Sequence, residues 1–196
     1  MTHSLYIIGG PGTGKSTLLA DILGGMEFGE VEALHAKRNK KALVTLRGQR
    51  LYSHERAVGT YLGINRPEFP GADALDNTSS PVGADWLETG SLPPFIVGEG
   101  LALTTRGFLA ALQDNTRLMV FHLICSDEER ERRFAARGSQ QNPNWVKQSV
   151  TRARNAGEFL RERGGRVVDI YTSDPDPDVT QMFVELAREW LGLADD

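Results

Sequence analysis

Short, wholly apolar runs alternate with amphipathic stretches along the chain, and this pattern predicts an α/β fold. The strand-like runs lie at residues 5–8, 95–97, 118–124 and 167–171. Helical periodicity with end signals follows at residues 14–24, 104–112 (with Thr104 as N-cap), 127–136, 144–163 and 178–191. Buried strands that alternate with helices are typical of a parallel sheet covered on both faces. We therefore expect a three-layer α/β fold with a parallel five-stranded sheet, in one domain spanning residues 1–196.

Two regions interrupt this alternation and predict additions to the sheet. Residues 35–80 contain short β-like runs at 42–46 and 57–62, followed by a stretch rich in Gly, Pro, Asn, Asp and Ser from residue 63. We interpret residues 35–80 as a small β-rich, substrate-binding insertion, before a helix that starts at Pro81. Residues 126–163 carry two Arg-rich helices and are interpreted as a helical lid.

The first apolar run leads directly into a phosphate-binding motif. Gly9, Gly14, Lys15 and Ser16 match the spacing G-x-x-x-x-G-K-[ST]. Glycines let successive backbone N–H groups face phosphate oxygens, and the following helix presents its positive end to the same anion. We expect ATP and Mg²⁺ here, with Lys15 reaching the β- and γ-phosphates and Ser16 ligating the ion. The residues assigned to the nucleotide in this motif are Gly10, Gly12, Thr13, Gly14, Lys15, Ser16 and Thr17.

Charge is strongly segregated, although the net charge is only −4. Residues 35–66 carry eight Lys and Arg residues against Glu55 alone, residues 130–163 carry nine against three acids, and residues 169–196 carry eight acids. Basic lobes on an acidic body favour a polyanionic partner, although a charged run is equally typical of a solvated face. We assign the polyanion-gripping role to Lys40, Lys41 and Arg47.

Cysteine and hydropathy exclude several other classes. The single Cys125 cannot form an internal disulfide, and no Cys/His cluster has metal-ligand spacing. No apolar run approaches the ~20 residues of a membrane span, and no leader precedes the first strand. We therefore expect no membrane association and a soluble, cytoplasmic location, in the host cell if the protein is phage-encoded.

Together, the P-loop, the Arg-rich helices and the length resemble nucleoside and nucleotide kinases rather than GTPases or AAA-type ATPases. A narrower resemblance rests on residues 62–75, 96–100, 133–141 and 145–147, which are similar to phage kinases that phosphorylate 5-hydroxymethyluracil within DNA. Two positions depart from that family's pattern: Ala72 replaces a Thr, and Leu101-Ala102 replaces an Asp-Arg pair. The resemblance implies a DNA partner that contains a modified pyrimidine.

Further residues are assigned from their positions. Glu99 ends a buried strand, where it is expected to approach Mg²⁺, although a turn carboxylate is the alternative. Asp73 matches, by position, the acid that serves as general base in deoxynucleoside kinases, and a turn-forming Asp is equally plausible.

The arginines are assigned to phosphate. Arg133 and Arg137 lie four residues apart on a predicted helix and resemble lid arginines that bind ATP, although pairs between Glu129 and Arg132 or Arg133 would suit a solvated helix. Arg137 is also assigned a catalytic role, the stabilisation of charge during phosphoryl transfer. Arg66 is assigned to an acceptor phosphate or to the DNA backbone.

Three functions stay open at this point. The first is an ATP-dependent kinase that acts on the hydroxymethyl group of 5-hydroxymethyluracil in DNA. The second is a kinase of free nucleosides, nucleotides or another small metabolite. The third is a nucleotide-binding module without phosphoryl transfer. The basic stretch at 35–66 favours the first over the second, and Glu99 with the arginines disfavours the third.

Overall fold

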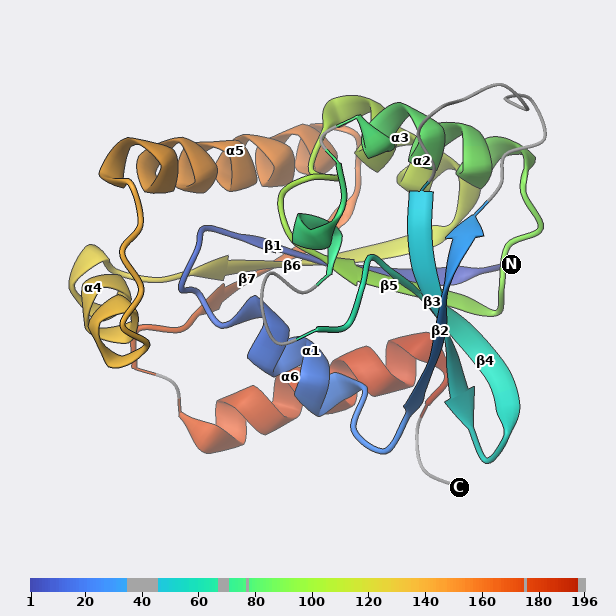
Figure 1. Cartoon of the computed structure of the whole chain (residues 1–196), viewed down its shortest axis with the longest axis horizontal. Helices are drawn as coiled ribbons and strands as arrows, with labels where there is room; N and C mark the ends of the chain where they lie inside the picture. The colour runs from blue at the N-terminus through green and yellow to red at the C-terminus, as the bar shows by residue number, and fades with distance from the viewer. Residues whose placement is uncertain (35–45, 67–70, 77, 175, 194–196) are drawn as a thin grey trace.

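The computed structural model describes residues 1–34, 46–66, 71–76, 78–174 and 176–193 (Figure 1). The strands in these residues are β1 (His3–Gly9), β2 (Glu27–Leu34), β3 (Leu46–Ser53), β4 (Arg56–Leu62), β5 (Phe95–Glu99), β6 (Arg117–Ile124) and β7 (Arg166–Tyr171). The helices are α1 (Lys15–Ile22), the short 3₁₀ helix η1 (Ala72–Ala74), α2 (Ser79–Thr89), α3 (Arg106–Asn115), α4 (Asp127–Ala136), α5 (Pro143–Glu162) and α6 (Pro177–Leu191).

The described strands form one mixed sheet in the order β2-β3-β4-β5-β1-β6-β7. Neighbours from β4 to the β7 edge pair in parallel, whereas β3 pairs antiparallel with both β2 and β4. The prediction of a parallel five-stranded sheet is therefore wrong: in the described part of the chain the sheet has seven strands and is mixed. A two-residue turn with positive φ at His54 and Glu55 joins β3 to β4, and such a turn makes an antiparallel hairpin. The β-rich segment thus extends the main sheet.

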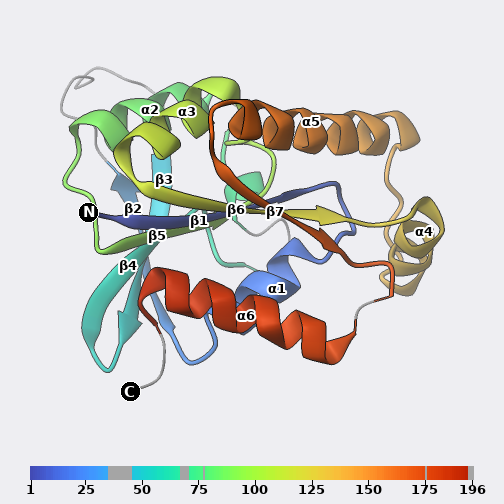
Figure 2. The same ribbon diagram turned by 180° about the vertical axis from the view of Figure 1, so that it is seen from behind.

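Two hydrophobic cores lie on opposite faces of this sheet (Figures 1 and 2). Alternate residues of β1 divide between them, because successive side chains of a strand point to opposite faces. Tyr6 and Ile8 join the core beneath α2, α3 and α5, while Leu5 and Ile7 join the core beneath α1 and α6. The central strand is buried on both sides, as the apolar run predicted.

The starts of the predicted helices lie within two residues of the starts in the structure. Ser126 accepts a hydrogen bond from the Glu129 N–H at the start of α4. The predicted cap Thr104 is wrong by one residue, because Thr105 accepts from the Phe108 N–H of α3. Thr104 instead donates its hydroxyl to the Gly100 carbonyl, 2.7 Å away. The helix predicted from Pro81 begins at Ser79.

Other differences concern the segment between α1 and α2. Strand β2 had no counterpart in the sequence analysis, and the strand expected at 42–46 lies outside the described residues except for Leu46. The region interpreted as a lid comprises α4, which lies beyond the carboxyl ends of the strands, and α5, which lies along one face of the sheet (Figure 1). No helix in the described part of the chain is long and apolar enough to cross a membrane.

Candidate active site

The phosphate-binding motif lies in the turn between β1 and α1. Gly12 and Gly14 have φ values of 77° and 90°, in the left-handed region that favours glycine. A Cβ on Gly12 would also approach Phe134 of α4 to 3.1 Å, so the loop needs glycine there for space as well. Thr13 donates its hydroxyl to the Gly10 carbonyl at 2.8 Å, and the buried Lys15 ammonium donates to the same oxygen at 3.2 Å. The loop is therefore closed on itself, with Lys15 folded over it.

Glu99 lies against this loop because β5 is the neighbour of β1. The strand register pairs Ile7 with Glu99, and the Ser16 hydroxyl donates to Glu99 Oε1 at 2.7 Å. Glu99 is only 2% exposed. Burial raises the pKa of Glu99, while Lys15 and the Ser16 hydrogen bond oppose the rise and Asp73 adds to it.

The pair of Ser16 and Glu99 fits a Mg²⁺ site. A hydroxyl oxygen and a carboxylate oxygen are donors that Mg²⁺ prefers, and this ion commonly takes one or two protein ligands plus phosphate oxygens and water. A buried carboxylate that faces a hydroxyl also gains from a cation, since burial disfavours its charged form. The two residues predicted as metal ligands are thus brought together, although their ligand role stays a prediction.

Asp73 is placed next to Glu99 by a hydrogen bond across the chain. The Leu101 N–H donates to Asp73 Oδ1 at 2.7 Å, and Asp73 itself is exposed on η1. The turn that supplies this N–H is fixed at Gly100, whose φ is 106° and whose carbonyl accepts from the Tyr6 and Thr104 hydroxyls. A Cβ on Gly100 would lie 2.7 Å from Asp73 Oδ1, so only glycine permits this approach. Asp73 therefore lies, like the P-loop, at the carboxyl ends of the strands.

A pocket of about 240 Å³ opens beside Ser16 and Glu99. Its walls include Phe28 and Tyr61, whose rings meet edge to face at 5.4 Å between centroids, together with Asn65. Sequence reasoning missed these three residues, since Phe28 belongs to the unpredicted β2 and Tyr61 read only as a strand residue. Burial and the carboxylates Glu99 and Asp73 raise the pKa of Tyr61 far above its usual range, so its hydroxyl stays protonated.

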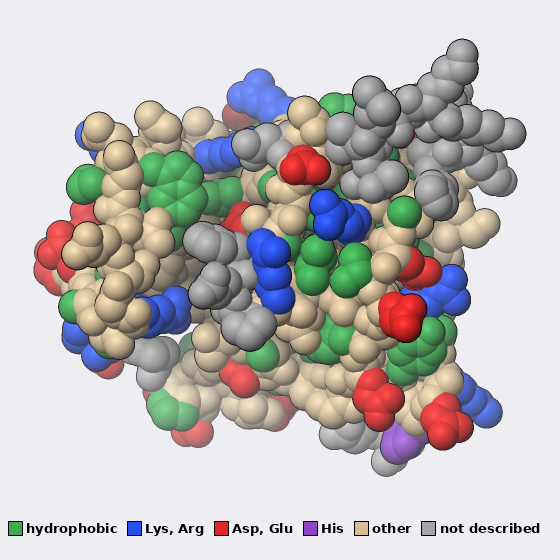
Figure 3. Space-filling view, in the orientation of Figure 1, with side chains coloured by type: hydrophobic (Ala, Val, Ile, Leu, Met, Phe, Trp, Pro, Cys, Tyr) green, Lys and Arg blue, Asp and Glu red, His purple; other side chains and the backbone are tan. Residues whose placement is uncertain are grey.

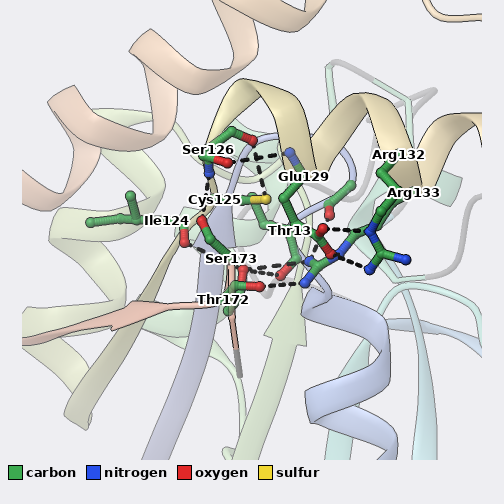
Figure 4. Close-up of polar contacts among 10 residues, drawn as sticks. Thr13, Ile124, Cys125, Ser126, Glu129, Arg132, Arg133, Thr172 and Ser173 are labelled. Carbon is green, nitrogen blue, oxygen red and sulfur yellow. Dashed lines mark hydrogen bonds and ion pairs between the residues drawn. The ribbon is translucent and has the colours of Figure 1, made fainter. Parts of the chain in front are cut away.

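Arg133 is tied to the P-loop rather than free above it (Figure 4). Its Nη1 donates to the Gly12 carbonyl at 3.0 Å, its Nη2 donates to the Thr172 carbonyl, and its Nε donates to Glu129 at 2.7 Å. Thr172 in turn donates its hydroxyl to the Thr13 carbonyl at 3.1 Å. We name the group Gly12, Glu129, Arg133 and Thr172 the α4 clamp. Thr172 has no sequence signal, because its partners lie 39 and 159 residues away.

Glu129 also accepts two hydrogen bonds from Arg132, at 2.6 and 2.7 Å. The alternative interpretation, in which Glu129 pairs with arginines of its own helix, is therefore correct for Arg132. Arg137 differs from Arg133, since it is exposed at the end of α4. It lines a pocket of about 530 Å³ together with Thr13, Gly14, Thr17 and Arg133. This pocket continues past Tyr171 and Thr172 to α6, which gives room for the base and sugar of a nucleotide whose phosphates lie in the loop.

Four basic residues were assigned to the backbone of the DNA acceptor, and the structure describes only two of them. Lys40 and Lys41 lie outside the described residues. Arg47 is exposed on β3 and Arg66 is exposed beyond β4. In the same basic stretch, Arg50 pairs with Glu32 at 2.9 Å. The role of these side chains toward DNA stays a prediction.

One comparison with known proteins, the match to a family model, agrees with this geometry. Residues 1–186 match the model of a family described as P-loop Nucleotide Kinase3. No curated protein matches the sequence. Among solved structures, an unliganded sugar kinase from Janibacter sp. HTCC2649 aligns over 99% of this chain and 96% of its own, with 16% identity and a TM-score of 0.45, a likeness that carries no argument about substrate. Because the family model spans nearly the whole sequence, from the P-loop through α4 and α5 into α6, the chain belongs to the P-loop Nucleotide Kinase3 family.

Proposed function

We propose that this protein transfers the γ-phosphoryl group of ATP to an alcohol, and that the alcohol is the hydroxymethyl group of 5-hydroxymethyluracil in DNA. The observation that carries the proposal is the convergence of Ser16, Glu99 and Asp73 at the end of the P-loop. Lys15 and the loop N–H groups are suited to align the phosphates, and Mg²⁺ held by Ser16 and Glu99 would neutralise charge on the phosphoryl oxygens.

Asp73 provides the chemistry that an alcohol acceptor needs. The acceptor oxygen forms a bond to the γ-phosphorus while the bond from that phosphorus to the β–γ bridging oxygen breaks, and ADP leaves. The hydroxyl proton passes to the Asp73 carboxylate, whose Oδ1 is oriented by the Leu101 N–H. An acceptor phosphate would need no such base.

The lining of the 240 Å³ pocket favours a neutral acceptor. Among the described residues that line it there is no Lys or Arg, and Leu101 and Ala102, which stand where similar kinases carry Asp-Arg, are buried. A nucleoside monophosphate would lack a charged partner for its phosphate there. The rings of Phe28 and Tyr61 and the amide of Asn65 instead suit one flat, hydrogen-bonding ring such as a pyrimidine.

Incubation with γ-labelled ATP and three acceptor sets tests the proposal: duplex DNA containing 5-hydroxymethyluracil, the same duplex with thymine, and a panel of free nucleosides and nucleotides. We expect label only on the modified duplex. Label confined to free nucleotides would overturn the DNA acceptor, and absence of label with ATP still bound would overturn phosphoryl transfer.

A matched pair of variants then tests the base. Asp73→Asn should lower kcat at least about 100-fold, the scale of general-base catalysis, with ATP affinity preserved. Asp76→Asn removes an exposed carboxylate three residues away and should leave kcat unchanged. Equal rates for the two variants would show that Asp73 is not the base.

A further inference from the structure

A second recess, distinct from both pockets at the P-loop, lies between α3 and α5. Its volume is about 610 Å³, within the range of ligand sites. The side chains that line it are Thr104, Arg106, Asn144, Lys147, Gln148, Thr151, Arg152, Asn155 and Ala156. None of these is acidic, and every polar member can donate a hydrogen bond. We name it the α3–α5 groove.

Three cations of the α3–α5 groove have no ion pair in the described part of the chain. Arg106, Lys147 and Arg152 are exposed, and no described carboxylate pairs with them. The guanidinium of Arg106 stacks over the Phe159 ring at 5.4 Å, which fixes a cation of α3 against α5. Other arginines of α5 are paired instead: Arg154 with Glu158 and Arg161 with Asp169. On α5, the two cations without an ion pair in the described residues, Lys147 and Arg152, therefore both line the groove.

The α3–α5 groove lies close to the P-loop and to the turn at Gly100. Val150 of α5 packs on the P-loop so closely that a Cβ on Gly10 would lie 2.6 Å from its Cγ2, and the groove residues Lys147 and Thr151 flank Val150 on the same helix. At the other wall, Thr104 bonds the Gly100 carbonyl, in the turn that also orients Asp73. Figure 3 shows Lys and Arg side chains over α5 along the upper edge of the molecule. The groove thus lies beside the turn that orients Asp73.

We propose that the α3–α5 groove binds phosphate groups of the acceptor, supplied as the phosphodiester backbone of a polynucleotide. Guanidinium and ammonium groups on both walls, with amide and hydroxyl donors between them, suit successive phosphates. Trp145, 44% exposed at the start of α5, offers an aromatic face on which a base can stack. The inference rests on the proposed function for the identity of the acceptor, and its test requires no turnover.

Fluorescence anisotropy with a labelled 12-nucleotide DNA, without ATP and over a series of salt concentrations, measures this binding. We expect the variant Arg106→Gln/Lys147→Gln/Arg152→Gln to bind at least about tenfold more weakly, with a slope of log K against log salt reduced by about 2 to 3, since each phosphate contact contributes about 0.7 to 0.9. Arg154→Gln is the matched control, because it removes one charge from the same helix outside the groove. ATP binding of all variants and the melting curves of the two single variants should match wild type, whereas the triple variant loses the stacking of Arg106 on Phe159 and should melt slightly lower. The single variant Lys147→Gln should give an intermediate slope.

Equal affinity and slope for the triple variant and the Arg154→Gln control would overturn the proposal, as would failure of the wild-type protein to bind the DNA. Competition separates the two sources of phosphate: displacement by millimolar thymidine 5′-monophosphate or inorganic phosphate would indicate a monophosphate site and contradict the polynucleotide. Failure of the two proposals is distinguishable. DNA bound through the groove without phosphoryl transfer would refute the proposed function alone, and transfer with an unaffected triple variant would refute the groove alone.

Discussion

The α4 clamp allows a quantitative test, because Arg133 joins three chain segments through one guanidinium. Arg133→Gln removes its bonds to the Gly12 and Thr172 carbonyls, while Glu129 keeps both bonds from Arg132. The Arg133 side chain is 17% exposed, so we take each of the two backbone bonds at the lower end for charged groups, about 1.5 kcal/mol, and expect a loss of about 3 kcal/mol. For a chain of this length, this corresponds to a fall in melting temperature of about 6 to 12 °C.

The same substitution should weaken ATP binding, because the Gly12 carbonyl is then no longer held and the loop must be ordered by the nucleotide itself. Thermal denaturation by circular dichroism and ATP titration by calorimetry measure the two effects. Arg133→Lys keeps the charge but lacks the planar fork that reaches both carbonyls, so most of the loss should persist. Arg132→Gln is the control, since Arg132 is largely exposed and, among the described residues, is bonded to Glu129 alone; its melting temperature should fall less than that of Arg133→Gln.

Equal melting temperatures for Arg133→Gln and Arg132→Gln would refute the clamp. A lower melting temperature with unchanged ATP affinity would confine Arg133 to a structural role. Arg137→Gln completes the comparison: this exposed residue lines the nucleotide-sized pocket, so it should lose ATP affinity or rate without loss of stability.

Three further predictions address other parts of the site. Burial raises the pKa of Glu99, and a carboxyl whose folded pKa is raised contributes stability below its unfolded pKa that is lost as pH rises through the folded value. Glu99→Gln should therefore raise the melting temperature of the nucleotide-free protein near pH 8, and this rise should shrink toward pH 4. Mg²⁺-dependent turnover should fall. A rise in melting temperature that grows toward acid pH would contradict the prediction. Hydrogen bonds from Arg132, then from Arg133, lower the pKa of Glu129 to about 2, so its contribution to stability holds above the ordinary value and is lost as pH falls toward 2. NMR titration should find that value, and Arg132→Gln should move it upward. Gly10→Ala should weaken ATP binding because its Cβ meets Val150 at 2.6 Å, and Val150→Ala in the same chain should restore the affinity; no rescue would place the cause elsewhere.

Elements whose signals are local were predicted well from the sequence. The apolar run before Gly9 and the G-K-S sequence after it specify a strand, a turn and a helix within 20 residues, and β1 and α1 lie there. Phe95–Val97 reads as a buried strand because every residue is apolar, and β5 is buried throughout. The start of α4 at Asp127 was predicted, and the hydrogen bond that caps it, from the Glu129 N–H to Ser126, spans only three residues.

Strand β2 was missed because its sequence does not carry the burial pattern of a strand. Only Leu34 of Glu27–Leu34 is buried, and the strand contains three glutamates and a glycine. Its conformation depends on pairing with β3, through a ladder that is interrupted between Phe28 and Val31. Edge strands of this kind are specified by the partner strand rather than by their own residues. Because β2 was not predicted, Phe28 was not recognised as a residue that lines the pocket beside Glu99.

The two halves of the candidate site differ in how far sequence reasoning could reach. Glu99 could be placed near the P-loop from a general rule, because the carboxyl ends of neighbouring parallel strands meet and β5 is the neighbour of β1. Arg133 could not be placed in this way: its bond to Gly12 spans 121 residues, and its bonds to Thr172 depend on where β7 ends relative to α4. A helical spacing of four therefore grouped Arg133 with Arg137 as ATP-binding lid arginines, with a catalytic role for Arg137 alone. The topology instead gives Arg133 a backbone clamp and leaves Arg137 exposed in the pocket. The α3–α5 groove resembles the Arg133 case, since Arg106 and Lys147 line one recess only when α3 packs beside α5.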